Sequence, residues 1–593
     1  MRDYSRFEVW APNAREVALA LEPRTGTHRR EIAMERGDGD WWHAPGLAAQ
    51  PGDRYGFLLN GSTSPLPDPR SLSQPEGVHG LSEVFDPRSL SFKAPWKGMD
   101  VRGKVIYELH IGTFGADRTA GTAGTFDSAI ARLDHLSALG VNAVEIMPIA
   151  AFPGERGWGY DGVGLYATHE AYGGPAALAR FVDAAHERGL AVILDVVYNH
   201  LGPDGNYLGH FGPYFTDTHS TPWGPAVNLD ADGSSEVRAF ILANARQWLR
   251  DFHLDGLRLD AVHALRDDSP THILAELSRA VECMSTEAGR PLSLIAESDL
   301  NDPAMVTPVA EGGFGMHAQW ADDIHHHLHA WASGEREGYY VDFGEARGVK
   351  KTLERIFEHD GSFSTFRGKT WGQKVDPASG DYNAHAFVAF IQDHDQVGNR
   401  AAGDRLTETI GFGTHAALAS LYLLGATTPM VFMGEEWGTK VPFAFFSDHG
   451  EEIGPLVSTG RREEFARMGW GDAVPDPQAR TTFEESFLDW SETQSGAHAA
   501  LLEFYRTLLT LRRERNDFQC GDFASIEVEA LTEGAILMHR GRYSILASRG
   551  DAPVTWQSPS PVRKLASFGG AHLEGESLTL EGAGALVCER SDA

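Results

Sequence analysis

The feature that most constrains the fold is a series of short apolar runs separated by helix-length segments between Lys104 and about residue 433. The runs are rich in Val, Ile and Leu, which is typical of parallel strands buried on both faces. Counted with one weaker candidate at MHAQW, there are eight. Eight strands alternating with helices favour an α/β fold of the (β/α)8 TIM-barrel type, with an open doubly wound sheet as the rival. The runs are VIYELHI, NAVEIMPI, AVILDVV, DGLRLD, LSLIAE, MHAQW, AFVAFIQDHD and PMVFMG.

One intervening segment, SSEVRAFILANARQWLRDF, shows the helical period clearly. Its apolar residues recur at intervals of three and four, so they line one face of a predicted helix on the barrel exterior. Ser234 and Ser235 are the predicted N-caps, because a serine hydroxyl accepts from the unpaired N–H groups of a first helical turn. The predicted buried face consists of Val237, Phe240, Ile241, Ala245, Trp248 and Leu249.

Two β-rich regions flank the predicted barrel. Residues 1–98 alternate short runs such as FEVWAP and RYGFLLN with turn clusters and close on the proline-rich passage SPLPDPRSLSQPEG. After the helical LLEFYRTLLTLRRE, residues 516–593 return to short β-like runs. We therefore expect three domains: an N-terminal immunoglobulin-like β-sandwich over 1–98, a barrel with loop insertions over 99–515, and a C-terminal β-sandwich over 516–593.

Charge and cysteine usage exclude several classes of partner. The chain of 593 residues has 51 Lys plus Arg against 83 Asp plus Glu, a net charge of −32, so neither nucleic acid nor an anionic membrane is expected as its main partner. Its three cysteines lie far apart and lack the paired spacing of cysteines that bind a metal ion. No stretch approaches the roughly 18 apolar residues of a membrane span. We expect a cytoplasmic protein that acts on a small molecule, with no metal and no cofactor.

Acidic residues close four of the apolar runs: Asp195, Asp260, Glu297 and Asp395. In a barrel, catalytic groups lie at the carboxyl ends of the strands, so these four acids are the predicted catalytic face. For each acid alone, a helix N-cap or a carboxylate on the barrel rim is the better explanation. Four of them in one ordered series favour a shared catalytic site.

The surroundings of two of these acids predict different roles. Strand periodicity places Arg258 and Asp260 on the same face, and an adjacent guanidinium favours the ionised carboxylate that a nucleophile needs. Glu297 ends the strongly apolar run LSLIAE, where desolvation raises the pKa of a carboxyl group, as a general acid requires.

The four ordered motifs resemble those of glycoside hydrolase family 13, the α-amylase family. They span Asp195 to His200, Asp255 to His263, Ile295 to Glu297, and Ile391 to Asp395. The resemblance implies that Asp260 is the nucleophile, Glu297 the general acid/base and Asp395 a third carboxylate that stabilises the transition state. It also implies a retaining reaction, in which the two main carboxyl groups lie about 5–5.5 Å apart. The sugar-binding positions that it implies are Asp195, His200, Arg258, His263, His394, Gln396 and Asn399.

Aromatic residues after the second run support a carbohydrate ligand, because sugar rings stack on aromatic faces. Trp158 and Tyr160 lie in the glycine-rich segment RGWGYDGVG, and Tyr160 resembles the family's stacking residue beside the bond that is cleaved. Core packing is an equally good explanation of Trp158.

Segments outside the shared motifs narrow the resemblance to the trehalose-releasing members of the family. These segments are WAPNA, PGDRYGF, SQPEGVHG, WGYDGV, TPWGPAVN, LNDP, DQVGNRAAGDRL and GRREEF. The resemblance implies hydrolysis of the α-1,4 bond next to the terminal trehalose of malto-oligosyltrehalose, and a functional pairing with malto-oligosyltrehalose synthase. Two alternatives stay open: a 1,4-α-glucan branching enzyme, and a non-catalytic α-glucan-binding protein. The branching alternative is disfavoured because Gln396 follows Asp395 and Ser298 follows Glu297, where branching enzymes usually have glutamates.

The segment QWADDIHHHLHA is the predicted contact with the trehalose end of the substrate. Asp322 and Asp323 accept hydrogen bonds from sugar hydroxyls, and His325 donates or accepts. A metal site at the clustered histidines is the weaker alternative, since a helix directs them to several sides. Calcium near Asn199, known in many amylases, stays open.

Overall fold

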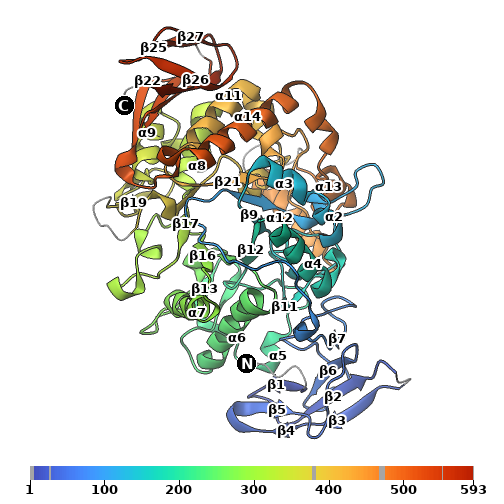
Figure 1. The fold of residues 1–593 in the computed structure, drawn as a ribbon. Coiled ribbons are helices and arrows are strands. Elements are labelled where there is room, and N and C mark those ends of the chain that lie inside the picture. The colour runs from blue at the N-terminus through green and yellow to red at the C-terminus, as the bar shows by residue number, and fades with distance from the viewer. Residues whose placement is uncertain (1–5, 26–27, 377–381, 467–473, 551, 592–593) are drawn as a thin grey trace.

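The computed structural model describes residues 6–25, 28–376, 382–466, 474–550 and 552–591. A central barrel separates a β-sandwich near the N-terminus, blue in Figure 1, from a second β-sandwich at the C-terminus, red in Figure 1. Within the described residues, no helix is both long enough and apolar enough to cross a membrane.

Eight parallel strands close into the barrel, in the order β12-β15-β16-β17-β20-β21-β8-β9. Each predicted apolar run overlaps one of them, so the barrel is confirmed and the open sheet is excluded. Apolar side chains such as Ile193, Ile295 and Phe390 are fully or almost fully buried, and they form a compact core with Trp320. The strands are β8 (Ile106–Leu109), β9 (Ala143–Ile146), β12 (Ala191–Val196), β15 (Gly256–Leu259), β16 (Ser293–Ala296), β17 (Ala318–Trp320), β20 (Phe387–Ala389) and β21 (Thr428–Phe432).

Helices cover the outside of the barrel (Figure 1). The link from β16 to β17 departs from the regular pattern, because it consists of 3-10 turns at Pro303–Met305 and Val309–Glu311 and not of an α-helix. The α-helices are α1 (Ile111–Phe114), α2 (Phe126–Ile130), α3 (Leu133–Leu139), α4 (Gly174–Glu187), α5 (Leu208–Phe211), α6 (Ser234–Arg246), α7 (Ile273–Ala288), α8 (Asp322–Ser333), α9 (Ala346–Arg355), α10 (His394–Gly398), α11 (Leu406–Leu423), α12 (Gly454–Ala466), α13 (Arg480–Glu485) and α14 (Gly496–Glu514).

The helix predicted from SSEVRAFILANARQWLRDF is α6, which continues into a π-helical turn over Gln247–Asp251. All six residues of its predicted apolar face are buried. The predicted serine N-caps are wrong: the N-cap is Gly233, whose φ of 82° places it in the left-handed region, and no side chain caps the helix. Glycine adopts this backbone conformation without the steric cost that a serine has.

Two sheets form the N-terminal sandwich, in the strand orders β1-β5-β4 and β3-β2-β6-β7. Their apolar residues, among them Leu19 and Phe57, belong to the same core as the barrel exterior, so the sandwich packs firmly against the barrel. The strands are β1 (Glu8–Trp10), β2 (Val17–Glu22), β3 (Arg30–Ala33), β4 (Glu35–Arg36), β5 (Trp41–His43), β6 (Arg54–Leu59) and β7 (Ser82–Glu83).

The C-terminal sandwich has a five-stranded sheet, β22-β23-β24-β29-β26, and a three-stranded sheet, β25-β28-β27. Both predicted sandwiches are therefore confirmed. The predicted boundaries fall between β7 and β8 and between α14 and β22, and they stand as proposed limits. The strands are β22 (Ile526–Thr532), β23 (Ala535–Arg540), β24 (Tyr543–Ser548), β25 (Val554–Gln557), β26 (Val562–Phe568), β27 (Ala571–Glu574), β28 (Ser577–Leu580) and β29 (Gly584–Arg590).

In the described part of the barrel, three antiparallel pairs are inserted into the loops. Two of them carry exposed aromatic residues: Trp223 in the turn of one, and Phe363 and Phe366 in another. The pairs are β10 (Ala150–Ala151) with β11 (Gly164–Thr168), β13 (Phe215–Thr221) with β14 (Gly224–Val227), and β18 (Ser362–Ser364) with β19 (Lys369–Trp371).

Candidate active site

A cavity of about 750 Å³ opens where the barrel strands end, and the three predicted catalytic acids line it: Asp260, Glu297 and Asp395. Such cavities are the usual binding sites for small molecules. Six of the predicted substrate-binding residues line it as well: Trp158, Tyr160, His200, His263, His394 and Asn399.

The Arg258 guanidinium joins the acids of neighbouring strands. Its Nη1 donates to Asp195 at 2.8 Å and to Asp260 at 2.9 Å, while its Nη2 lies 3.3 Å from Glu297 Oε2. Asp195 and Arg258 are register partners on β12 and β15, and the guanidinium lies 4.2 Å from the ring centroid of Trp320. The contact between Arg258 and Asp260 expected from strand spacing is therefore present. Because the side chain is fully buried, the positive charge acts on these carboxylates in a low-dielectric environment.

Glu297 has the environment of a general acid. Its pKa is raised to about 8, first by burial and then by the nearby carboxylates of Asp260 and Asp395, while Arg258 opposes the shift. The backbone N–H of Ala261 donates to Glu297 Oε2. Ala261 has a φ of 38°, an unusual value for a residue with a β-carbon, and this local strain lies directly beside the acids.

Asn199 contacts Asp260, the predicted nucleophile, and this contact was not predicted from the sequence. Its Nδ2 donates to both the backbone oxygen and the Oδ2 of Asp260, each at 2.7 Å. Its Oδ1 lies 2.5 Å from His200 Nδ1. Asn199 therefore fixes one oxygen of the Asp260 carboxylate while Arg258 fixes the other. The signal was present in the motif DVVYNH, where Asn199 was considered only for calcium.

A buried ion pair supports the Asp395 side of the cavity. His394 donates to Glu108 from its backbone N–H at 3.0 Å, and its Nδ1 lies 2.5 Å from the same carboxylate. Burial disfavours the imidazolium, but the carboxylates of Glu108 and Asp395 outweigh it and raise the pKa of His394 to about 10. Glu108 is a second missed residue, and its signal was a charged side chain inside the apolar run VIYELHI.

Tyr160 connects the Asp195 side of the site to the His394 side. Its hydroxyl donates to Asp195 Oδ2 at 2.6 Å and lies 2.8 Å from His394 Nε2, and its ring stacks on His394 with centroids 5.0 Å apart. Trp158 is buried, donates from Nε1 to Ala444 O at 3.1 Å and also lines the cavity. Trp158 therefore both packs in the core and forms part of the cavity wall.

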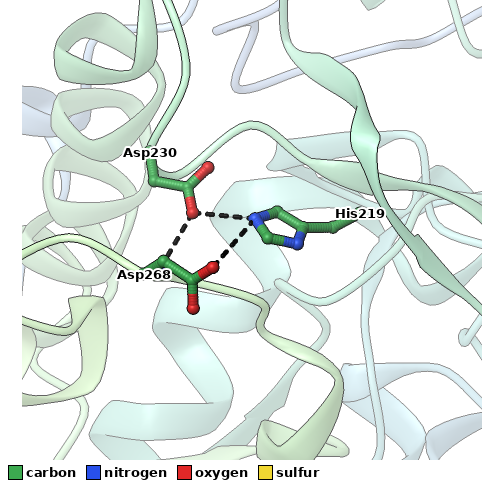
Figure 2. Close-up of side chains that lie close together, drawn as sticks. All are labelled: His219, Asp230 and Asp268. Atoms are coloured by element: carbon green, nitrogen blue, oxygen red, sulfur yellow. Dashed lines mark hydrogen bonds and ion pairs between the residues drawn. The ribbon is translucent and has the colours of Figure 1, made fainter.

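The β13–β14 hairpin forms the wall on the His200 side. Trp223 stacks on His200 with centroids 4.6 Å apart and an interplanar angle of 11°, and half of its surface is exposed. Figure 2 shows how this hairpin is held: His219 Nε2 lies 2.8 Å from Asp230 Oδ2, and the same oxygen accepts the backbone N–H of Asp268 at 2.8 Å. The Asp268 carboxylate is 87% exposed and 3.9 Å from His219, so the group serves as an anchor for the hairpin and supports no metal assignment.

The three residues predicted to contact the trehalose end, Asp322, Asp323 and His325, all lie on helix α8 but have different surroundings. Asp323 Oδ2 accepts from the backbone N–H groups of Glu358 at 2.7 Å and His359 at 3.0 Å, and also from Asn301 Nδ2 at 2.8 Å. His325 is buried, with its Nε2 3.2 Å from the Tyr340 hydroxyl. These placements do not support the predicted sugar contacts of Asp323 and His325, because both side chains hold the fold together.

Asp322 remains near the acids of the site. Its pKa is raised well above the usual value, first by burial and then by nearby carboxylates that include Asp393, Asp299 and Asp395. The α8 histidines that were weighed as metal ligands have separate partners: His327 with Glu358 at 3.1 Å, and His329 with Glu335 at 2.9 Å.

Two exposed aromatic residues beside Gln396, Tyr339 and Phe366, were not predicted. Tyr339 and Phe366 are 38% and 56% exposed and meet edge to face with centroids 6.2 Å apart. The Tyr339 hydroxyl donates to Gln396 Oε1 at 3.3 Å. Next to Phe366, Arg367 donates to Asp299 at 2.9 Å, which ties the β18–β19 hairpin to the segment that follows Glu297. Asp299 Oδ1 also lies 3.6 Å from His263 Nδ1.

A polar bridge stabilises the loop after Asp395. The Arg400 guanidinium contacts both oxygens of Glu335 at 3.1 Å, and Glu335 in turn contacts His329. One residue earlier, Asn399 donates to Asp395 Oδ1 at 3.1 Å. The bridge therefore joins the segment that carries Tyr339 to the segment that holds the third acid.

Comparisons with known proteins agree with this architecture. Residues 111–212 match the family model of the alpha amylase catalytic domain, and residues 2–72 match carbohydrate-binding module 48, the isoamylase N-terminal domain. A malto-oligosyltrehalose trehalohydrolase from Arthrobacter ramosus is 49% identical over 98% of this chain and 99% of its own length. One from Mycobacterium tuberculosis is 45% identical over 93% of this chain and 96% of its own.

A solved structure from Salmonella typhimurium, described as a candidate alpha amylase, is 36% identical, with a TM-score of 0.88 over 99% of this chain and 97% of that one. The relatives share nearly the whole chain, including both sandwiches and the barrel. This chain therefore belongs to the malto-oligosyltrehalose trehalohydrolases of the α-amylase family.

Proposed function

We propose that this protein hydrolyses the α-1,4 bond next to the terminal trehalose unit of malto-oligosyltrehalose and releases trehalose, with retention at the anomeric carbon. The observation that carries the proposal is the pairing of Asp260, ion-paired to Arg258, with Glu297, whose pKa is raised to about 8, in the cavity at the strand ends. A carboxylate held by a guanidinium, beside a second carboxyl group with a raised pKa, is what a retaining glycosidase requires.

Each step follows from these groups. Glu297, protonated at neutral pH, donates its proton to the glycosidic oxygen while the Asp260 carboxylate attacks the anomeric carbon, so trehalose departs and a glycosyl-enzyme forms. Glu297, now ionised, then takes a proton from water as the water oxygen attacks the same carbon and frees Asp260. Arg258 and Asn199 hold the two oxygens of Asp260 in place, and Asp395 accepts hydrogen bonds from sugar hydroxyls.

The two ends of the cleft take different parts of the substrate. Because Glu297 protonates the leaving group, trehalose lies on the side of Glu297. The segment after Glu297 is tied through Asp299 and Arg367 to the hairpin that carries Phe366. We therefore assign Tyr339, Phe366 and Gln396, with Asp322 nearby, to the trehalose end. The glucan chain lies along Tyr160, His200 and Trp223 on the opposite side.

Two broader assignments belong to the same proposal. The substrate implies a supplier that closes the reducing end of a malto-oligosaccharide into a 1,1-linkage, which is the reaction of malto-oligosyltrehalose synthase. Three free cysteines at Cys283, Cys520 and Cys588 fit a reducing, cytoplasmic compartment.

Product analysis tests the proposal against both alternatives. The full chain is incubated with maltotriosyltrehalose, with maltopentaose of equal length and with amylose, and Asp260→Asn serves as the inactive control. We expect free trehalose from the first substrate and much slower cleavage of the second. New α-1,6 branch points in amylose would identify a branching enzyme, and binding without any product would identify a non-catalytic protein.

A further inference from the structure

Helix α12, in the segment that follows β21, places Arg461 on the wall of the catalytic cavity. The Arg461 guanidinium lies 5.1 Å from the ring centroid of Phe445 and 4.7 Å from that of Phe465. Its side chain is only 11% exposed, whereas that of the next residue, Arg462, is 55% exposed. Two aromatic rings hold a guanidinium in one orientation, so its hydrogen bonds reach fixed acceptors. Arg461 belongs to the segment GRREEF and takes no part in the proton transfers or the nucleophilic attack proposed for the reaction.

The acceptors of Arg461 lie at the C-terminal end of helix α10, which carries Asp395. Arg461 Nη2 donates to the backbone oxygen of Gly398 at 2.7 Å, and its Nη1 donates to Asn399 Oδ1 at 3.2 Å. Gly398 is the last residue of α10, and Asn399 is its C-cap. The last carbonyl groups of a helix have no partner within the helix, and an arginine is a favourable donor to them. Arg461 therefore closes the end of this five-residue helix.

Trp158 restricts the same end of α10. An ideal β-carbon at position 398 would lie 2.0 Å from Trp158 Cζ2, so no residue larger than glycine fits without moving the indole. The indole itself is fixed, because its Nε1 donates to Ala444 O at 3.1 Å and its ring stacks on Phe443 with centroids 5.3 Å apart. The end of α10 is therefore held by a fixed indole and a fixed guanidinium.

Asn399 transmits the position of Arg461 to the third acid. A guanidinium has only donors, so it binds the oxygen of the Asn399 amide and leaves the NH2 group for another acceptor. That acceptor is Asp395 Oδ1, at 3.1 Å from Asn399 Nδ2, while Asp395 Oδ2 lies 3.7 Å from His394 Nε2. The Asp395 side chain is 43% exposed, so these few contacts orient a carboxylate that is open to the substrate.

We propose that Arg461 is a positioning residue for the reaction: through Gly398 and Asn399, it fixes the orientation in which Asp395 meets the sugar ring at the bond that is cleaved. The proposal rests on the proposed function, and within it on the role of Asp395. A small displacement of a group that stabilises the transition state costs rate even when the substrate still binds. Loss of Arg461 should therefore lower kcat while changing KM little.

A double-mutant cycle with maltotriosyltrehalose tests the proposal. Arg461→Gln and Asn399→Ala should each lower kcat by about three- to tenfold, the effect of one typical hydrogen bond that acts in the transition state. The double variant should be no slower than the slower single variant, because both changes break the same chain of contacts. Arg462→Gln is the matched control on the same helix; its guanidinium lies 3.5 Å from Asp476, and we expect the wild-type kcat.

Asn399→Asp separates positioning from folding. An aspartate keeps an oxygen acceptor for Arg461 but has no NH2 group to donate to Asp395. We expect a protein with the wild-type Tm by circular dichroism, and a loss in kcat at least as large as that of Asn399→Ala. Wild-type kcat in a folded Asn399→Asp protein would overturn the proposal.

The second substrate distinguishes positioning from direct sugar binding. Because Asp395 acts on the ring at the cleaved bond, Arg461→Gln should lower kcat by the same factor for maltotriosyltrehalose and for maltopentaose. Additive losses in the cycle, or a rise in KM confined to one substrate, would overturn the proposal. Failure of the proposed function would appear instead in the wild-type protein, as absence of trehalose from maltotriosyltrehalose.

Discussion

Replacing Arg258 with lysine tests the arrangement of the acids most sharply. The guanidinium binds Asp195 and Asp260 through one nitrogen at 2.8 and 2.9 Å and approaches Glu297 at 3.3 Å through another. A lysine keeps one charge but cannot reproduce a planar fork that reaches three carboxylates. It therefore loses at least one charge-assisted hydrogen bond, worth about 1.5–3 kcal/mol.

If that bond acts in the transition state, kcat/KM on maltotriosyltrehalose falls by about 10- to 150-fold. The assay is the initial rate of trehalose release, with circular dichroism to establish that the variant is folded. Arg290→Lys is a matched control, because Arg290 also lies over a tryptophan, with its guanidinium 4.3 Å from the Trp96 ring and outside the cleft. A folded Arg258→Lys protein with wild-type kcat/KM would refute the reasoning.

The other predictions concern the acid and the trehalose end. The pKa of Glu297 is raised to about 8, so its proton-donating form is present below that pH and kcat/KM should fall as pH rises through about 8. Glu297→Gln should nearly abolish turnover. A flat kcat/KM profile from pH 6 to 10 contradicts the assignment of Glu297 as the acid. Replacing either Arg400 or Glu335 with glutamine should raise KM for maltotriosyltrehalose by about two- to fivefold, and the double variant should show no further rise in KM. Additive rises in KM would show that the bridge does not act as a unit. Phe366→Ala should reduce kcat/KM for maltotriosyltrehalose by about tenfold and for maltopentaose much less, with Phe363→Ala on the same hairpin as control; equal losses on both substrates would remove Phe366 from the trehalose end.

The barrel was predictable because buried parallel strands have a strong local signature. Runs such as LSLIAE and AVILDVV carry almost no polar residue before the strand ends, so both the strand and the catalytic acid that follows it are marked in the sequence. The contact between Arg258 and Asp260 was predictable for the same reason, since the period of a strand fixes which side chains share a face.

Contacts between segments distant in sequence were not predictable. Glu108 meets His394 across 286 positions, and nothing in VIYELHI indicates which barrel residue its carboxylate binds. Asp323 and His325 were assigned to the substrate because their side chains are polar, but the side of α8 that faces the cleft depends on packing against neighbouring segments. The aromatic pair of Tyr339 and Phe366 comes from two parts of the connection between β17 and β20, the 3-10 turn Gly338–Asp342 and the β18–β19 hairpin, which only the folded chain brings together.

The central claim is most directly tested by following maltotriosyltrehalose hydrolysis by proton NMR from the first seconds of reaction. The account predicts two signals that grow together: those of free trehalose, and the α-anomer of maltotriose ahead of its slow equilibration with the β-anomer. The α-anomer reports retention through an Asp260 glycosyl-enzyme, and trehalose reports the bond that was cleaved. Initial formation of the β-anomer would contradict the double displacement, and glucose or maltose in place of trehalose would contradict the assigned specificity.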